Sequence, residues 1–418
     1  MPRSGRRAPF RSFLAGSAVA AAFLASCKSA PPESVPNPPA AKNYSQPLPE
    51  GQLALEKIVD PRDYPDFADG LADRDSLLRA IDESLAYYKK PSSKKYFPYL
   101  DITHERAMKS LAAFRTLVTA AATGEELNRE IVSRFDVYRS VGCDNAGTVL
   151  FTGYCEPIYR GSPTPTAEYR FPLYKLPPDV VKDEEGKPLG KRTAFGLVPY
   201  DTREAIETGR VLEGRGLELV WLRDRLEAYI VHVQGSARIL LPDGKELKVG
   251  YAGKTDRPYR SIGQALVDDG HIRADDLSLT AIKSHFAKHP EDMEHYLFLN
   301  ESYVFFQESK DGPFGSLGAK VTPLRTIATD KGVFPRGAIA FADTMKPNLS
   351  EVGAIEKRPF RSFVLDQDTG GAIRSAGRCD LFMGTGPDAE RLAGHTRSEG
   401  KLYYLFLKDA LVRSTATP

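Results

Sequence analysis

The stretch Leu365–Gly386 reads LDQDTGGAIRSAGRCDLFMGTG and carries the chain's most informative chemistry. Two of its carboxyl groups, Asp368 and Asp380, stand among glycines and short apolar runs. Glycine lets the backbone approach a ligand closely, and apolar neighbours hold a carboxyl group protonated near neutral pH. Cleavage of a glycosidic bond requires such an acid. An aspartate beside a glycine is equally typical of a turn, so residue types alone leave both interpretations open.

The sequence around this stretch predicts a mainly β fold with helices at the N-terminal end. Apolar positions recur at helical spacing, or follow a capping residue, over Asp73–Lys89, Thr103–Ala121 and Thr123–Phe135. From Gly147 onward, short apolar runs broken by Gly, Pro and Asp are typical of strands in barrels. These runs are Thr148–Tyr154, Leu217–Leu222, Ala228–Val233, Ile239–Leu241, Tyr303–Phe306, Ala338–Ala342, Phe363–Leu365 and Leu402–Leu407. One helix pair, Ser261–Asp269 and Ser278–His289, interrupts them.

Composition and charge narrow the class of protein. The chain has 418 residues, of which 41% are apolar and 27% charged, as in globular proteins of two or three domains. The net charge is +2, but residues 1–26 hold four arginines and no acid, so the remainder carries −2. A nearly neutral body lacks the basic surface that nucleic acids require, and we expect no nucleic-acid partner.

The N-terminus predicts a lipoprotein signal peptide over residues 1–26. Its apolar stretch, Phe13–Leu24, spans only about 18 Å as a helix, too short for a hydrocarbon core of ~30 Å. The following Leu24-Ala25-Ser26-Cys27 resembles a bacterial lipobox, which predicts lipidation of Cys27 and a membrane anchor. Because Lys28 replaces the aspartate that retains many such proteins at the inner membrane, we expect the outer membrane, facing the periplasm. Residues 27–50 are proline-rich and predict a tether.

The remaining cysteines and histidines leave few further sites. Cys143 and Cys155 could form a disulfide in an oxidising periplasm. The alternative is that Cys143, Cys155 and Cys379 are three unpaired thiols. His285 and His289 have the four-residue spacing of zinc ligands. The glutamate of an H-E-x-x-H site is absent, so we expect a solvated helix face and no metal site.

Two other motifs have weak alternatives. The tripeptide Asp368-Thr-Gly370 matches aspartic proteases, but these need two such carboxylates, and a single copy would require a symmetric dimer. The glycine-rich loops Gly312–Gly318 and Gly384–Gly386 lack the Lys-Ser/Thr of a P-loop. We therefore expect no nucleotide and no cofactor.

Motifs in a fixed order between Phe151 and Leu407 resemble a known family. They are FTGYCEP (151–157), YRFPLY (169–174), VQGS (233–236), VGYAG (249–253), PYRSIG (258–263), SYVFFQ (302–307), GSLG (315–318), TP (322–323), DTGGAI (368–373) and DLFMG (380–384). Together they resemble the MltA-type membrane-bound lytic murein transglycosylases. The helical region before Gly147 matches less clearly.

The resemblance implies an architecture. It predicts a double-psi β-barrel domain with a second, smaller β-rich domain inserted into it, and a substrate groove between the two. Residues 51–162 would supply the helices and the first barrel strands, 163–300 the inserted domain, and 301–418 the C-terminal, catalytic part of the barrel. Ligand sites at domain interfaces are common on general grounds.

The resemblance also implies an activity. Family members cleave the β-1,4 bond between N-acetylmuramic acid and N-acetylglucosamine in peptidoglycan without water, leaving 1,6-anhydromuramyl ends. By similarity Asp380 is the general acid and then base, and Asp368 a positioning or electrostatic partner. The substrate-binding candidates are Tyr154, Gln234, Gly235, Ser236, Tyr251, Tyr259, Arg260, Ser261, Gly370 and Gly371.

The expected partners are glycan strands, with proteins of cell-wall synthesis or division as further candidates. Two alternatives remain open at this point. One is an inactive, envelope-anchored glycan-binding scaffold, and the other is a water-using muramidase, which needs a second carboxylate about 5–9.5 Å from the acid.

Overall fold

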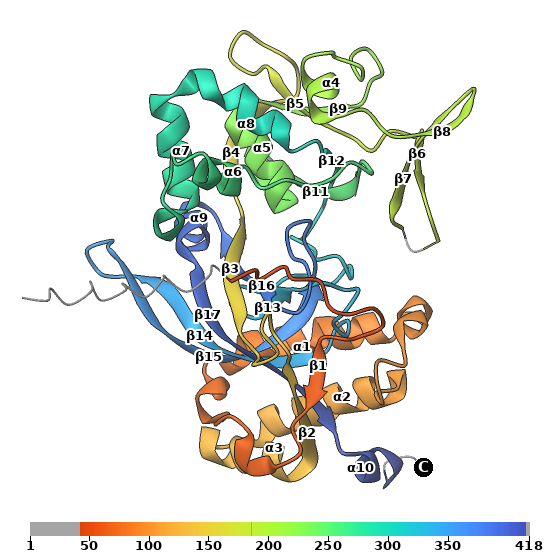
Figure 1. Ribbon diagram of the computed structural model, residues 1–418, viewed down its shortest axis with the longest axis vertical. Coiled ribbons are helices and arrows are strands. Elements are labelled where there is room, and N and C mark those ends of the chain that lie inside the picture. Colours follow the sequence, from red (N-terminus) through yellow and green to blue (C-terminus); the bar gives the residue numbers. More distant parts are fainter. Residues whose placement is uncertain (1–41, 185, 415–418) are drawn as a thin grey trace, which may run out of the picture. The chain divides into compact units, whose positions relative to one another are not determined.

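The computed structural model describes residues 42–184 and 186–414 (Figure 1). The three predicted N-terminal helices are confirmed as α1 Arg74–Tyr88, α2 His104–Ala120 and α3 Gly124–Arg134. Their N-cap residues, Asp73, Thr103 and Thr123, each accept a backbone N–H group with a side-chain oxygen. Such caps satisfy donors that the first turn leaves unpaired, which is why these helix starts are visible in the sequence. Short 3-10 helices are η1 Pro61–Asp63, η2 Ala68–Leu71, η3 Pro91–Tyr96, η4 Ala274–Asp276 and η5 Pro290–Asp292.

Six strands form a closed barrel. They are β3 Val149–Glu156, β13 Thr326–Ala328, β14 Ile339–Leu349, β15 Ile355–Asp368, β16 Arg378–Thr385 and β17 Arg397–Leu407. Neighbours pair in the order β17–β14–β15–β13–β16–β3, and β3 pairs again with β17, which closes the sheet. Two further strands, β1 Leu55–Lys57 and β2 Phe135–Ser140, extend the sheet from β17. The predicted barrel is thus confirmed, with β3 contributed from the N-terminal side of the inserted segment.

The segment between β3 and β13 builds a second β-rich part, which we call the insert and define as residues 158–308 (Figure 1). Its main sheet has the order β12–β11–β10–β4–β9–β5. The strands are β4 Ile158–Ser162, β5 Phe171–Tyr174, β9 Glu218–Leu222, β10 Ser236–Leu240, β11 Glu246–Lys254 and β12 Val304–Glu308. A three-stranded sheet adds β6 Val180–Lys182, β7 Pro188–Thr193 and β8 Gly196–Val198. The helices are α4 Arg203–Glu207, α5 Arg225–Gln234, α6 Ile262–Asp268, α7 Leu279–Lys288 and α8 Met293–Leu299. The predicted bounds 163–300 leave β4 and β12 outside this sheet.

The barrel and the insert have separate hydrophobic cores. Phe114, Phe341 and Phe363 are fully buried where the helices pack on the barrel, and the rings of Phe114 and Phe363 lie 4.7 Å apart. Val231 and Ile239 are fully buried in a different cluster inside the insert. Each part therefore buries its own apolar surface, as independent folding units do.

The run Ala228–Val233 is helical, and its prediction as a strand is wrong. It lies in α5, whose start is capped by Asp224 and whose end is Gly235 with a φ of 81°. Residues 228–232 are all buried, so the run has no polar face, and periodicity alone does not separate a buried helix from a buried strand. The helices α9 Pro387–His395 and α10 Asp409–Ser414 were not predicted either.

Cys143, Cys155 and Cys379 are free thiols, so the open disulfide alternative is not realised. Cys143 packs against Gly377, whose carbonyl oxygen accepts from the backbone N–H of Leu150 near the start of β3. Cys155 lies near the end of the same strand. At ~3.3 Å per residue, the strand carries Cys155 about 16 Å away from Leu150, far beyond the reach of a disulfide.

Part of the predicted tether lies on the barrel. The signal peptide, Cys27 and residues 28–41 lie outside the described residues. At the start of the described chain, Lys42 Nζ and the Tyr44 hydroxyl bind the carboxylate of Glu399 on β17 at 2.8 and 2.6 Å. No helix within residues 42–184 and 186–414 has the length and apolarity needed to span a bilayer.

A buried ion pair stands inside the barrel. The Asp366 carboxylate on β15 accepts hydrogen bonds from Lys331 Nζ and from the hydroxyls of Thr329 and Tyr404. The side chains of Lys331 and Asp366 are only 4% and 0% exposed. A pair so deeply desolvated depends on both partners.

We expect Lys331→Met to lower the free energy of unfolding by about 3–5 kcal/mol, because it leaves the Asp366 carboxylate buried without its counter-charge. The double variant Lys331→Met/Asp366→Asn should recover part of that loss, since a neutral amide costs less to bury than a carboxylate. Urea denaturation measures both.

Lys245→Met is the matched control, since Lys245 pairs with Asp243 at an 80% exposed position. This substitution should lower the free energy of unfolding by less than about 1 kcal/mol. Equal losses for Lys331→Met and Lys245→Met would contradict the prediction.

Candidate active site

The strand register brings the two predicted carboxylates to one row of the barrel. Ala328 on β13 pairs with Asp368 on β15 and with Asp380 on β16, and Asp380 pairs with Thr152 on β3. Paired residues on adjacent strands present their side chains to the same face of a sheet. Asp368 and Asp380 therefore share a face, separated by the small side chain of Ala328.

A β-bulge selects which residue of β15 enters this row. Ile327 pairs with Asp366, and the next residue, Ala328, pairs with Asp368, so Gln367 is left out of the register. The Gln367 amide is buried and donates instead to the Ala80 carbonyl and the Ser84 hydroxyl of α1, at 2.8 and 2.9 Å. Bulges re-aim side chains in this way beside functional sites. Here the bulge puts a carboxylate where regular pairing would put an amide.

Asp380 combines a partly exposed side chain with a strongly desolvated carboxyl group. The Thr152 hydroxyl donates to Asp380 Oδ1, and Arg378 Nη2 donates to that same hydroxyl oxygen at 3.2 Å. Burial raises the pKa of Asp380 to about 6, an effect that the charge of Arg378 opposes and the charge of Asp368 reinforces. The carboxyl group is thus held near half-protonation at mildly acidic pH, with its second oxygen free of Thr152.

Asp368 has a different environment. Its Oδ1 accepts from the backbone N–H groups of Ser316 and Thr369, both at 2.8 Å, and its Oδ2 accepts from the Tyr154 hydroxyl at 3.0 Å. Burial raises its pKa, while these donors favour the charged form and limit the rise. The approach of Ser316 depends on Gly315, where an added Cβ would lie 2.6 Å from the Gln367 carbonyl oxygen.

Some predicted substrate-binding residues join these carboxylates. Tyr154 lies on β3 and bonds to Asp368. The ring of Tyr259, from the insert, lies over the turn after Asp368, since a Cβ added to Gly371 would be 3.7 Å from its Cγ. Desolvation raises the pKa of Tyr259, and the charges of Arg378 and Asp380 act on its hydroxyl. Gly370 and Gly371 form this turn beside the acid row.

The other candidates are used within the insert or at its border with the barrel. Gln234 Oε1 accepts from the backbone N–H of Cys155 at 2.8 Å, which ties the end of α5 to β3. Gly235 ends α5, and Ser261 caps the start of α6. In the insert sheet, Ser236 pairs with Gly250 and Tyr251 pairs with Phe306. The backbone N–H of Arg260 donates to the side-chain oxygen of Asn300. These strand pairings and hydrogen bonds do not reach Asp368 or Asp380. Tyr251 keeps a half-exposed side chain.

Thr152, Arg378 and Ser316 are site residues that the sequence reasoning missed. Thr152 and Ser316 lie inside the motifs FTGYCEP and GSLG, and Arg378 lies two residues before Asp380. Residues two apart on a strand share a face, so this spacing could have flagged Arg378. Within the chain, the Asp368-Thr-Gly370 tripeptide shares a row with Asp380, which is not part of an Asp-Thr-Gly motif.

Two family models match the chain: the MltA specific insert domain over residues 150–307 and the 3D domain over residues 325–406. Membrane-bound lytic murein transglycosylase A of Vibrio cholerae is 32% identical over 272 residues, which cover 64% of this chain and 68% of that protein. The chain belongs to the MltA family. The predicted resemblance is therefore confirmed, and the chain is related to enzymes named for murein cleavage.

Solved structures agree with the MltA assignment. The membrane-bound lytic murein transglycosylase from Agrobacterium tumefaciens is 28% identical, covers 86% of this chain and 99% of its own, and superimposes with a TM-score of 0.71. Escherichia coli MltA with bound chitohexaose is 22% identical and has a TM-score of 0.64, with 87% and 99% of the chains covered. At that identity the second structure supports the fold alone.

We expect the pKa of Asp380 to move in opposite directions in two variants. Arg378→Gln removes a positive charge that favours the carboxylate and should raise the pKa above about 6, whereas Asp368→Asn removes a negative charge and should lower it. Carbon-13 NMR of labelled aspartate carboxyl groups measures both shifts without substrate. The matched control is Arg374→Gln, because the nearby Arg374 is not among the charges acting on Asp380. Shifts of the same sign would refute this electrostatic account.

We expect Asp380→Asn to stabilise the fold at neutral pH. The folded-state pKa of Asp380 is raised from 3.8 to about 6, so between these values the folded state binds more protons than the unfolded chain. The protonated Asp380 therefore contributes fully to the free energy of unfolding below pH 4, and this contribution is lost as the pH rises towards 6. The difference in free energy of unfolding between Asp380→Asn and the wild type should therefore shift in favour of the variant by up to about 3 kcal/mol between pH 4 and pH 7. Unfolding curves at both pH values measure this difference. A shift in favour of the wild type with rising pH would exclude a raised pKa for Asp380.

Proposed function

We propose that this chain is a peptidoglycan lytic transglycosylase that cleaves the β-1,4 bond between N-acetylmuramic acid and N-acetylglucosamine and leaves 1,6-anhydromuramyl ends. The observation that carries the proposal is the desolvated, partly exposed Asp380, whose pKa is raised to about 6. An acid of this strength exists in both protonation states near the operating pH, which general acid–base catalysis requires. Membership of the MltA family supports the substrate class.

The hydrogen bond from Thr152 gives the proton transfer a direction. Because the Thr152 hydroxyl donates to Oδ1 of Asp380, the acidic proton belongs on Oδ2. In the first step Oδ2–H passes its proton to the glycosidic oxygen, the bond from that oxygen to the muramyl anomeric carbon breaks, and an oxocarbenium-like centre forms. Arg378, behind Thr152, restrains the hydroxyl that orients the carboxyl group.

In the second step the same carboxylate acts as a base. It accepts the proton of the muramyl C6 hydroxyl while that oxygen bonds to the anomeric carbon, and Asp380 is protonated again at the end of the cycle. The nucleophile belongs to the substrate, so proximity supplies what a hydrolase obtains from water and a second catalytic carboxylate. A single acid–base residue is therefore sufficient.

Asp368 has an electrostatic and positioning role in this proposal. Three donors, from Ser316, Thr369 and Tyr154, occupy its two oxygens, which makes it a poor base for activating water. Its negative charge helps to raise the pKa of Asp380 and favours a positive oxocarbenium centre. This argues against the water-using muramidase alternative.

Glycan binding involves both parts of the chain. Tyr154 of the barrel and Tyr259 of the insert border the acid row, and tyrosine offers a flat face for a sugar ring and a hydroxyl for its polar groups. The structure of Escherichia coli MltA holds bound chitohexaose, a glycan with the same β-1,4 linkage, which is consistent with strand binding by this fold. We extend the glycan site along the insert through Gln234, Tyr251 and Arg260.

The proposed cellular setting is the bacterial envelope. The related enzymes are named membrane-bound. We propose lipidation at Cys27 as the means of attachment here, with the outer membrane as the location, on the basis of the lipobox and Lys28 in the sequence. Proteins of cell-wall synthesis and division remain proposed partners.

We expect Asp380→Asn to lower kcat on purified sacculi by about 10²–10⁴-fold while glycan affinity is retained, because the amide keeps the shape and loses the transferable proton. Asp368→Asn should lower kcat less, since the proton-transferring Asp380 remains. Mass spectrometry of released muropeptides should find anhydro ends, each one water lighter than the hydrolytic product.

The control is Asp388→Asn, an exposed carboxylate on α9, which should leave lysis unchanged. Reducing ends in the wild-type digest would indicate a muramidase. A wild-type protein that binds sacculi and is as inert as Asp380→Asn would indicate a scaffold.

A further inference from the structure

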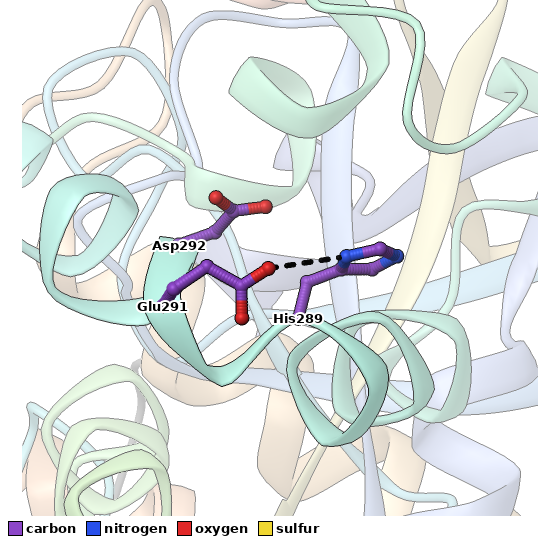
Figure 2. A group of neighbouring side chains, drawn as sticks. All are labelled: His289, Glu291 and Asp292. Carbon is purple, nitrogen blue, oxygen red and sulfur yellow. Dashed lines mark ion pairs between the residues drawn. The ribbon is translucent and has the colours of Figure 1, made fainter.

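A second cluster of chemistry-bearing side chains lies at a corner of the insert, on elements separate from the acid row. Helix α7 ends at Lys288 with His289 as its C-cap, and Pro290 turns the chain directly into η5, which carries Glu291 and Asp292. Figure 2 shows the side chains of His289, Glu291 and Asp292 converging at this turn. His285, one helical turn before His289, stacks beside it with the two ring centroids 5.0 Å apart.

The distances in this corner match a metal coordination sphere. His289 Nδ1 lies 3.5 Å from Glu291 Oε1, and His285 Nε2 lies 3.4 Å from Asp292 Oδ2. The ligand atoms of His289, Glu291 and Asp292 all lie within 4.8 Å of one another. Four ligands at ~2.0–2.1 Å from a tetrahedral zinc ion would be about 3.4 Å apart. The His289–Glu291 spacing is already close to this value without any rearrangement.

His285 supplies an independent indication. Its side chain is only 7% exposed, and its Nε2 atom is buried without a hydrogen-bond partner. Buried polar atoms are almost always satisfied, so an unsatisfied one facing a carboxylate calls for an explanation. The ring is fixed from other sides by Phe286 and His271, whose centroids lie 5.3 and 4.9 Å away. The sequence-based expectation of a solvated helix face is therefore wrong for His285.

We propose that His289, Glu291 and Asp292 form a binding site for one divalent transition-metal ion, of which zinc fits best, and that His285 orients the Asp292 carboxylate. One imidazole nitrogen with two carboxylate oxygens suits zinc and its neighbours, whereas magnesium and calcium prefer oxygen ligands alone. Three protein ligands leave the fourth position of a tetrahedral ion to a water molecule, and the ion would link the end of α7 to η5. The missing catalytic glutamate of H-E-x-x-H does not count against a site of this kind.

The site would brace the helix that joins the insert to the barrel. On α7, Lys283 pairs with Glu390 of α9, and Glu390 also accepts from the Tyr159 hydroxyl of β4 at 3.0 Å. A metal ion that links the end of α7 to η5 fixes one end of this helix. Because α9 directly follows β16, which carries Asp380, the brace acts on the frame of the acid row and takes no part in its chemistry.

The test uses the full-length chain purified without a polyhistidine tag. Zn²⁺ competition against a chromophoric chelator should give one ion per chain, and Zn²⁺ should raise the thermal midpoint. Co²⁺ should produce the intense visible bands of a tetrahedral site. His289→Ala and Asp292→Asn, at exposed or half-buried positions that leave the core intact, should each weaken binding by at least about tenfold.

His295→Ala is the matched control, since His295 is an exposed histidine on the neighbouring α8, and it should bind metal as the wild type does. Absence of saturable Zn²⁺ binding would overturn the proposal and leave two ion-paired histidines. Binding retained in both His289→Ala and Asp292→Asn, or lost equally in His295→Ala, would overturn it too. These readouts involve no glycan, so they stand apart from the test of lytic activity.

Discussion

The pairing of the three-residue strand β13 with two longer strands is the constraint on which the rest of the structure depends. β13 joins β15 in parallel and β16 in antiparallel register, and without it the barrel would be open between them. The same backbone hydrogen bonds that close the barrel fix Asp368 and Asp380 on either side of Ala328. The geometry of the acid row is therefore tied to closure of the sheet, and a loop is not needed to position it. Sites built on strands are held more tightly than sites built on loops.

Three aspartates within this sheet differ because of what surrounds them. Asp366 is fully buried and paired with Lys331, which makes its charge part of the core. Asp368 faces neutral donors that favour its charged form. Asp380 accepts from one hydroxyl, that of Thr152, and carries the burial cost that raises its pKa to about 6. Burial raises the pKa of all three carboxyl groups, and hydrogen-bond donors oppose that rise at Asp366 and Asp368. The stability lost at Asp380 is the counterpart of the acid role that we propose for it.

Much of this arrangement could be predicted from the sequence, and what could not has physical reasons. Helix caps such as Thr103 and Thr123 are local signals, so the N-terminal helices were found with nearly correct bounds. Ordered motifs predicted Asp380 as the acid, and its catalytic role stays a prediction. The bulge at Gln367 was not predicted, because it depends on which partner residue β13 selects. Burial on all sides hid α5, and the carboxylates beside His285 became neighbours only through the turn at Pro290.

The insert is held to the barrel at points that adjoin the acid row. Gln234 bonds to the backbone of β3, and the buried Glu156 of β3 bonds to Arg238 of β10 at 2.8 Å and to Thr385 of β16 at 2.7 Å. Both β3 and β16 belong to the row itself. The ring of Tyr259 also lies over Gly371, at the same border. In the two-part glycan site that we propose, the cost of ordering the insert against the barrel is therefore met during folding and does not reduce the free energy of glycan binding.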